Sequence, residues 1–425
     1  MMECEREYKC KNGISIYYYK NPALHSFYIS LYLRAGCMYE SDSELGITHF
    51  LEHALIRNVN KLYGMELYTM LDKLGLEFNA STYSEMVQFY ISGAKAHLPE
   101  GIDIISKLLS PIVLTSAEVT AERKRIKAEI RESDDKTSLA TFSNKIVFDG
   151  STLANPIAGT NASVDRIGTQ ALENYRRRVM TPERMFFYVT GSFGDEELFA
   201  LAEKIGEIRL ESRDFVSNIA PVPKDFGCRC GLVNIKNADY TKLRFTFDID
   251  MTRYTVAETD LLYDMLLSGY NSKLFVEMSE KRGMFYDVSG SSERYKNIGT
   301  LSFSYEVKER DIYDAVRLTL EILNSVKRIE CAEAEIVRAG YVDNAEMLLD
   351  DARDLNFTFA YDNHVMSEGY TTVAMRRAGY AEVTAERLCE IASEVFVKSN
   401  FTLAVKCKKK RVDEEKINEI IACLL

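Results

Sequence analysis

The chain begins with two stretches, 13–19 and 26–33, in which polar and apolar residues alternate. Alternation with a period of two is typical of a β-strand with one buried face. The period then changes to that of a helix, because apolar residues up to Leu55 recur at intervals of three and four. Ser41 and Glu44 have the spacing of a capping box. We therefore expect two strands followed by a helix that begins near Ser41.

Helices and short strands continue to alternate along the chain. Helical periodicity returns over about 63–74 and 115–131, and an alternating strand covers 86–91. The regular strand–helix–strand rhythm of a doubly wound sheet is missing, so the pattern indicates an α+β fold. Residues 210–226 break the pattern and contain two prolines. We place a linker there, between a first domain at 1–209 and a second at 227–425.

The two halves share a local pattern. The residues from Lys73 to Leu76 precede Ser81, and those from Lys281 to Met284 precede Ser289, at an offset of 208 positions. In both places a helix comes before the segment and an alternating strand after it. This indicates a tandem duplication. The alternative is two unrelated α+β domains that use the same glycine-capped helix end.

Composition narrows the class of protein. The chain has 425 residues, a net charge of −11 and 46% hydrophobic residues, which is typical of a globular protein. The acidic balance argues against nucleic-acid binding. The start of the chain lacks the pattern of a signal peptide, and no stretch has the roughly 18 apolar residues of a membrane-spanning helix. With nine scattered cysteines, we expect a reduced, cytoplasmic protein without a membrane span.

Two of the five histidines, His49 and His53, lie four positions apart with Glu52 between them. On a helix both imidazoles share one face and can reach one ion, and histidine nitrogens suit Zn²⁺. The neighbouring carboxylate can take the proton of a zinc-activated water. The alternative is a pair of hydrogen-bonded core histidines on an apolar helix. Two histidines at this spacing in a chain with few histidines favour the interpretation as a metal site, with one zinc per chain.

A catalytic zinc requires a third protein ligand. The remaining histidines show no supporting spacing, whereas the helix over 118–132 carries four glutamates: Glu118, Glu122, Glu129 and Glu132. Glu122 and Glu129 lie seven positions apart and so share a face. Periodicity does not choose among the four, and a solvated helix face with exposed ion pairs remains an alternative.

The segment from Gly46 to His53 resembles the active-site helix of the pitrilysin/insulinase metallopeptidases, which carry the inverted motif H-x-x-E-H. That family takes its third zinc ligand from a glutamate about 75 residues further on, with another glutamate seven positions before it. Here Glu129 follows His53 by 76 positions, and Glu122 precedes Glu129 by seven. The resemblance implies Glu129 as the third ligand and Glu122 as a carboxylate that orients the site.

The resemblance extends over most of the chain. It implies two tandem related α/β-sandwich domains, each with a mainly antiparallel sheet packed with helices, and zinc ligands only in the first. The offset of 208 places Ala257, Asp260 and Leu261 at the positions of His49, Glu52 and His53. The segment Asn79, Ala80, Ser81 and Thr82 resembles the family's edge strand, to which an extended substrate adds as a further strand.

One position departs from the family pattern. The family pairs an arginine with a tyrosine seven positions later, and together they bind substrate carbonyls beside the zinc. Tyr286 is present, but Ser279 stands where the arginine is expected, and serine supplies no cation. Either Arg282 or another base replaces it, or another chain supplies the pair. We therefore expect a homodimer or a heterodimer with a related subunit.

The resemblance implies a zinc-dependent endopeptidase that cleaves unfolded peptides or leader and precursor peptides. His49, His53 and Glu129 would hold the metal, Glu52 would act as general base, and Tyr286 would assist from the second half. The alternative is a peptide-binding or structural subunit that keeps the fold without turnover. The complete ligand set favours the enzyme, whereas Ser279 keeps the alternative open.

Overall fold

The computed structural model of the protein describes residues 5–132, 138–217, 229–234, 240–268, 270–366, 370–408 and 412–422. The chain folds into two compact units. Unit 1 comprises 1–133, 155–218 and 346–372, and unit 2 comprises 134–154, 219–345 and 373–425. None of the helices in the described part of the chain is both long and apolar enough to cross a membrane.

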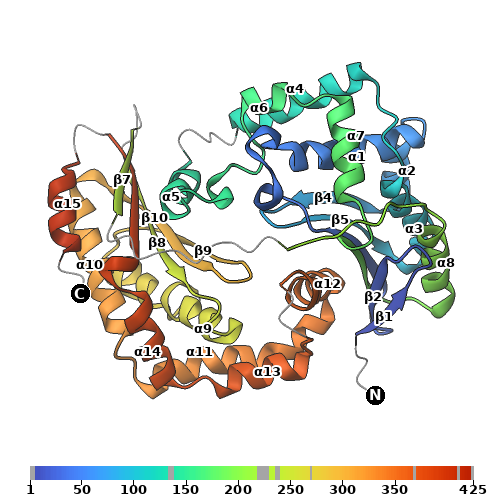
Figure 1. The fold of residues 1–425 in the computed structure, drawn as a ribbon. Coiled ribbons are helices and arrows are strands. Elements are labelled where there is room, and N and C mark those ends of the chain that lie inside the picture. Colours follow the sequence, from blue (N-terminus) through green and yellow to red (C-terminus); the bar gives the residue numbers. More distant parts are fainter. Residues whose placement is uncertain are drawn as a thin grey trace. The chain divides into compact units, whose positions relative to one another are not determined.

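Unit 1 is built on one sheet, whose strands lie in the order β1–β2–β6–β3–β5–β4. Figure 1 labels four of these strands, β1, β2, β4 and β5. β2 and β6 are parallel, and the other neighbouring strands are antiparallel. The strands are β1 (Arg6–Lys9), β2 (Ser15–Lys20), β3 (Ser26–Leu33), β4 (Glu77–Thr82), β5 (Val87–Ala94) and β6 (Met185–Gly191). The helices are α1 (Ile47–Leu62), α2 (Leu67–Leu74), α3 (Leu98–Ser106), α4 (Ser116–Glu132), α6 (Asn161–Asp165), α7 (Thr169–Val179), α8 (Asp195–Gly206) and α12 (Ala352–Ala360).

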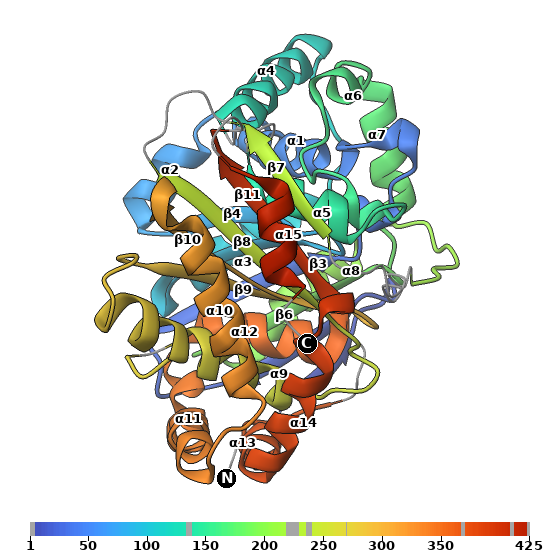
Figure 2. The same ribbon diagram turned by 90° about the vertical axis from the view of Figure 1, so that its left-hand side faces the viewer.

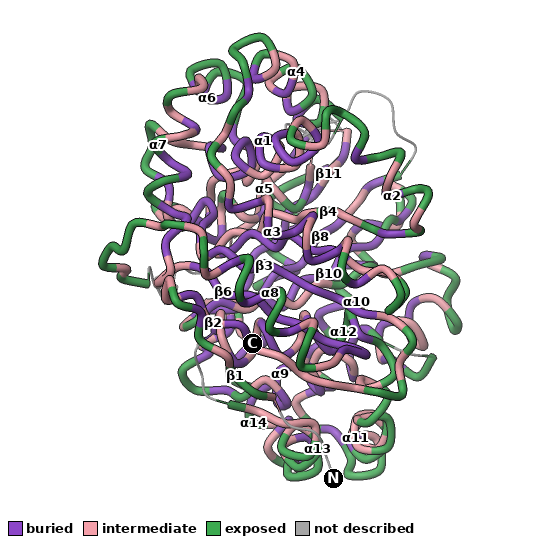
Figure 3. The backbone as a smooth tube through the Cα atoms, turned by 90° about the vertical axis from the view of Figure 1, so that its right-hand side faces the viewer, coloured by how far each residue is buried: buried purple, intermediate pink, exposed green. Residues whose placement is uncertain are grey.

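The sheet of unit 1 is covered on both faces. On the central strand β3, Phe27, Ile29, Leu31 and Leu33 belong to the main hydrophobic core, together with apolar residues of α1 and α3. The alternate residues Tyr28 and Tyr32 face α12 instead. Successive side chains of a strand point to opposite faces, and both faces are covered here. β3 is therefore buried along nearly its whole length (Figure 3).

Unit 2 repeats this plan, with the strand order β7–β11–β8–β10–β9 and one parallel pair, β7 with β11 (Figure 2). The strands are β7 (Arg229–Asn234), β8 (Tyr240–Ile249), β9 (Val288–Arg294), β10 (Gly299–Lys308) and β11 (Phe401–Cys407). The helices are α5 (Leu139–Val147), α9 (Val256–Leu267), α10 (Ile312–Val326), α11 (Cys331–Asn344), α13 (Val373–Glu382), α14 (Ala385–Val395) and α15 (Glu414–Ile421). In chain order, β7, β8, β9, β10 and β11 take the places of β2, β3, β4, β5 and β6, which supports the duplication.

Each repeat gives one helix to the other unit. α5 comes from the first half of the chain but packs on β11 and β8 of unit 2, where Ser143 and Thr246 are hydrogen-bonded through their hydroxyls at 3.0 Å. α12 comes from the second half but packs on β3 and β6 of unit 1, where Tyr32 donates to Asn356 Oδ1 at 3.0 Å. The expected ranges 1–209 and 227–425 did not anticipate this exchange. Of the expected linker, residues 218–226 lie outside the described part of the chain.

The expected start of the first long helix is wrong. Ser41 and Glu44 do form a capping box, but it closes a single 3-10 turn, η2 (Asp42–Glu44), and α1 begins only at Ile47. The chain first turns at Gly46, which has φ 85°. A Cβ on Gly46 would lie 2.8 Å from the Ala158 carbonyl oxygen, so only glycine fits between α1 and this loop.

Candidate metal centre

The N-terminus of α1 is held by a buried carboxylate. Glu40 accepts hydrogen bonds from the amides of Gly46 at 2.8 Å and Thr48 at 2.9 Å. Burial raises the pKa of Glu40, while these backbone bonds act in the opposite direction. The first amides of a helix otherwise lack partners, so Glu40 fixes the turn that presents His49.

His49 and His53 point from consecutive turns of α1 toward Glu129 on α4. The Nε2 atoms of both histidines lie 3.4 Å from Glu129 Oε2. Among the described residues, His49, His53 and Glu129 form a group whose donor atoms all lie within 4.8 Å of one another. The two histidines share one face of α1, and Glu129 reaches them from α4. The three side chains therefore form one convergent donor set.

The donor set fits Zn²⁺. With metal–ligand bonds of about 2.0–2.1 Å in tetrahedral geometry, neighbouring donor atoms stand about 3.3 Å apart, which is close to both nitrogen–oxygen distances. Two imidazoles and a carboxylate leave a fourth position open, as catalytic zinc sites do. Glu129 is half exposed, whereas His49 is buried.

Glu122 lies behind His53 and fixes its ring. Its Oε2 atom is 3.4 Å from His53 Nδ1, and its Oε1 atom accepts from Arg57 at 2.5 Å. Burial acts to raise the pKa of Glu122, but the hydrogen bonds with His53 and Arg57 outweigh it and lower the pKa to about 2. The carboxylate is therefore ionised and directs Nε2 of His53 at the donor set.

Glu52 lies between the metal donors and the edge of the sheet. Its Oε2 atom is 3.7 Å from His49 Nδ1 and accepts a 2.5 Å hydrogen bond from the Thr82 hydroxyl at the end of β4. The Glu52 side chain is only 12% exposed. Its carboxylate is thus held in place next to the donor set without being one of the three donors.

The electrostatic surroundings favour a cation. Burial acts to lower the pKa of His49, yet the hydrogen bond with Glu129 and the charge of Glu52 outweigh it, and the pKa is raised. His49 Nδ1 is buried, and none of the described residues forms a hydrogen bond with it. The same negative potential that favours a proton on the imidazole favours a divalent metal ion at this place.

The expected substrate segment forms the edge of the sheet. Asn79, Ala80, Ser81 and Thr82 pair with Tyr90, Phe89, Gln88 and Val87 of β5. Within the described part of the chain, no strand pairs with the outer side of β4. An edge strand exposes unpaired backbone donors and acceptors, to which an extended chain can add.

Tyr286 belongs to unit 2, whereas the metal donor set belongs to unit 1. Its side chain is 96% exposed. Ser279 lies in a π-helical turn, η6 (Phe275–Glu280), and donates to the Phe285 carbonyl at 2.9 Å. Arg282 donates to the carbonyl and carboxylate of Glu277. Ser279 thus has a local structural contact, and Arg282 is engaged by its own turn.

Sequence reasoning missed two residues that support the site. Arg57 follows His53 by four positions on the same helix, so helical spacing could have indicated it as a neighbour of the metal face. Glu40 gave no such signal, because its contact depends on how the loop before α1 turns at Gly46.

Two family models match successive parts of the chain. The family model described as Insulinase (Peptidase family M16) matches residues 16–161, and the one described as Peptidase M16 inactive domain matches residues 166–339. An uncharacterized zinc protease of Mycobacterium tuberculosis is 26% identical over 319 residues, which cover 74% of this chain and 73% of the relative.

Solved structures share the fold. A protease from Helicobacter pylori superposes with a TM-score of 0.86 at 16% identity, over 96% of this chain and all of that chain. The periplasmic protease PqqL from Escherichia coli superposes with a TM-score of 0.81 at 16% identity, over 99% of this chain but only 50% of PqqL. Together, the two matched family models show that the chain belongs to the insulinase family of peptidases, family M16.

Proposed function

We propose that the protein is a zinc-dependent endopeptidase that cleaves unfolded peptides. The observation that carries this proposal is the convergence of His49, His53 and Glu129 on one point, with the ionised Glu122 behind them and Glu52 beside them. When bound there, zinc supplies Lewis acidity, which polarises a carbonyl and makes water a nucleophile near neutral pH.

Glu52 is the residue that moves the proton. It takes the proton from the attacking water and later delivers it to the nitrogen of the leaving amine, so that one carboxylate serves both steps. Its position supports this role, because Oε2 is anchored by Thr82 and lies beside the donor His49. The low exposure of Glu52 limits competing solvent at the carboxylate.

The edge strand β4 positions the substrate. A peptide that pairs with the outer side of Asn79–Thr82 is held extended and runs past Thr82, whose hydroxyl contacts Glu52. Recognition through the backbone explains why the substrate must be unfolded, since a folded segment has its backbone groups already paired. Leader and precursor peptides meet this requirement.

A second subunit completes the site in this proposal. Ser279 offers no cation, Arg282 is bound to Glu277, and Tyr286 alone lacks the expected arginine partner. The chain also spans only half of PqqL, which supports the idea that a second block of two units faces this one. The partner is a second copy or a related subunit that supplies the Arg/Tyr element. The expected cytoplasmic location stays a prediction.

The decisive experiment uses the substitution Glu52→Gln. The amide keeps the size of the side chain but accepts no proton, so we expect one zinc per chain by elemental analysis and a loss of at least 100-fold in cleavage of an unfolded protein substrate. Undiminished cleavage by this variant would refute the mechanism. Parallel assays of the purified chain alone and with the products of neighbouring genes separate the two dimers, since full activity of the chain alone excludes the obligate heterodimer.

A non-catalytic subunit is the second candidate, and the position of Ser279 favours it. A subunit that no longer cleaves peptides needs neither the arginine nor the metal. Metal content distinguishes the two functions: less than about 0.1 zinc per chain after purification without chelators, together with retained peptide binding, would support the non-catalytic subunit.

A further inference from the structure

Unit 1 contains a cavity of about 540 Å³ that includes none of the metal-site residues. It lies between the first turn of α1, the turn before it and α7, and the segment after α8 contributes Arg213. This volume is within the range of small-molecule sites, about 300–1,000 Å³. The cavity is therefore large enough for an organic ligand.

The lining of the cavity is strongly cationic. Four arginines line it, Arg166, Arg177, Arg178 and Arg213, against one carboxylate, Glu44. All four arginines are exposed, so solvent screens part of their charge, and the rest attracts anions to the extent that the protein does not neutralise it.

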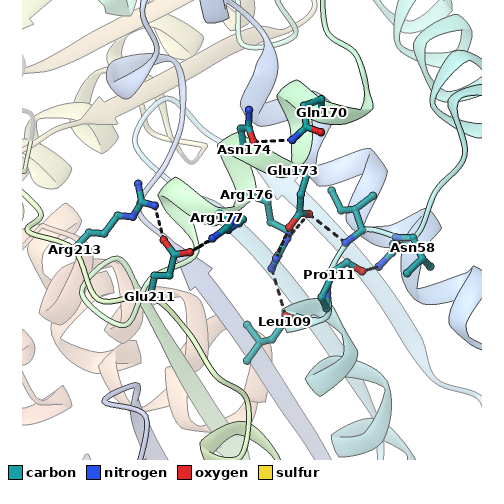
Figure 4. A network of polar contacts seen from close by, with 12 residues as sticks. Asn58, Leu109, Pro111, Gln170, Glu173, Asn174, Arg176, Arg177, Glu211 and Arg213 are labelled. Atoms are coloured by element: carbon teal, nitrogen blue, oxygen red, sulfur yellow. Dashed lines mark hydrogen bonds and ion pairs between the residues drawn. The ribbon is translucent and has the colours of Figure 1, made fainter.

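The protein neutralises only part of this charge. Arg178 is paired with Glu44 at 2.8 Å, and Glu211 lies between Arg177 and Arg213 and is bound by both (Figure 4). Arg166 is exposed and has no ion-pair partner within the described part of the chain. Four arginines against two carboxylates leave two positive charges in excess.

Part of the cavity lining is apolar. Ile47, Ile167, Ala171 and Tyr175 contribute to it, and the Tyr175 hydroxyl is bound to Thr48 Oγ1 at 2.6 Å. The Tyr175 ring is buried and lies under the guanidinium group of Arg178, 4.9 Å from its ring centroid. The cavity thus has cationic and apolar lining residues next to each other.

We propose that this cavity binds the phosphate dianion of a small phosphomonoester. A phosphate ester carries a charge of about −1.5 to −2 at pH 7, which matches the excess of two, whereas a single carboxylate neutralises half of it. Planar guanidinium groups bind phosphate oxygens in pairs of parallel hydrogen bonds. Ile47, Ile167 and Ala171 supply apolar contact for the organic part of the ester.

Titration calorimetry of the purified chain tests this inference with three probes: phenyl phosphate, phenyl sulfate and inorganic phosphate. We expect saturable binding of one phenyl phosphate per chain at pH 8, at least tenfold weaker binding of phenyl sulfate, which carries a single charge, and weaker binding of inorganic phosphate, which lacks the ring. A higher melting temperature with phenyl phosphate should accompany binding, because the ligand stabilises the folded state.

The substitution Arg166→Gln places the binding in this cavity. Arg166 is exposed and makes no ion pair in the described part of the chain, so its loss should leave the fold intact while weakening phenyl phosphate binding at least tenfold. Arg6→Gln, at an exposed arginine of β1 outside the cavity, should change the affinity less than twofold. The comparison also separates the cavity from phosphate bound at the metal centre.

Three results would overturn the inference: no binding of phenyl phosphate, unchanged affinity after Arg166→Gln, or equal affinity for phenyl phosphate and phenyl sulfate. Inorganic phosphate that binds as tightly as the ester would overturn the ester as ligand. None of these measurements depends on peptide cleavage, so the cavity and the proposed peptidase function are tested separately.

Discussion

The Thr82 hydroxyl donates a 2.5 Å hydrogen bond to Oε2 of Glu52. The edge strand and the metal-binding helix therefore meet at the carboxylate that is proposed to move the proton. Through this contact, the strand that is proposed to hold the substrate also holds the proposed general base.

Thr82→Val should lower kcat of peptide cleavage about 10- to 100-fold, because a hydrogen bond to a charged group contributes about 1.5–3 kcal/mol. Zinc content should stay at one per chain, since Thr82 contacts none of the three metal donors. Thr82→Ser keeps a hydroxyl and should recover most of the activity. A loss confined to KM would instead assign Thr82 to substrate binding.

Glu122→Gln should weaken zinc affinity about 10- to 100-fold, as loss of a carboxylate behind a metal-binding histidine typically does. The substitution removes the charge that fixes His53 and leaves Arg57 without its counter-ion. Competition with a chelator measures the affinity. Glu118→Gln is the matched control, because Glu118 lies one turn earlier on α4 and pairs with Lys61 instead. Equal affinities for the two variants would contradict the assigned role.

Asp248 on β8 should make unit 2 less stable at high pH. Burial raises the pKa of Asp248 to about 7, although the charge of Arg229 opposes this. The unfolded chain releases this proton near pH 4, so the folded state binds more protons between about pH 4 and pH 7. In that window, the free energy of unfolding falls as the pH rises.

The substitution Asp248→Asn should remove this dependence. We expect it to raise the free energy of unfolding by about 1–3 kcal/mol more at pH 8 than at pH 5, measured by urea denaturation. Asp287→Asn, at an exposed aspartate of the same unit, serves as the control and should show no such difference. If Asp248→Asn raised the free energy of unfolding equally at both pH values, the raised pKa of Asp248 would be contradicted.

Asn356 should be the most sensitive polar residue of α12. Its side chain is fully buried, accepts from Tyr32 and donates to the Tyr188 carbonyl at 3.0 Å. Asn356→Leu leaves these partners buried and unsatisfied, so unit 1 should lose about 2–4 kcal/mol of stability in chemical denaturation. Asp354→Ala on the exposed face of the same helix should cost less than about 1 kcal/mol.

The parts of the fold that depend on local pattern were predictable. Alternation predicted the strands that became β2 and β3, and helical periodicity together with a glycine predicted the end of α2 at Gly75. The start of α1 was misplaced by six residues. A capping box signals a helical turn but not how many turns follow, and the bend at Gly46 intervenes.

The candidate site was predictable to a different degree for each residue. Helical spacing alone put His49 and His53 on one face, whereas the choice of Glu129 among four glutamates required the family resemblance. Glu129 reaches the histidines through the packing of α4 against α1, which no local pattern encodes. The exchange of α5 and α12 was missed for the same reason, since it is a contact between distant parts of the chain.

The exchange of α5 and α12 bears on whether each half of the chain can fold separately. Ser143 and Asn356 occupy the same place in their helices, five residues from the start, and each bonds to the sheet of the other repeat. A single repeat on its own would lack the helix that the other repeat supplies here. The two repeats of the chain therefore exchange helices as two subunits of a domain-swapped dimer do. Cleavage of the chain between residues 209 and 218 should leave the two fragments associated. Either fragment expressed alone should lack one helix that covers its sheet.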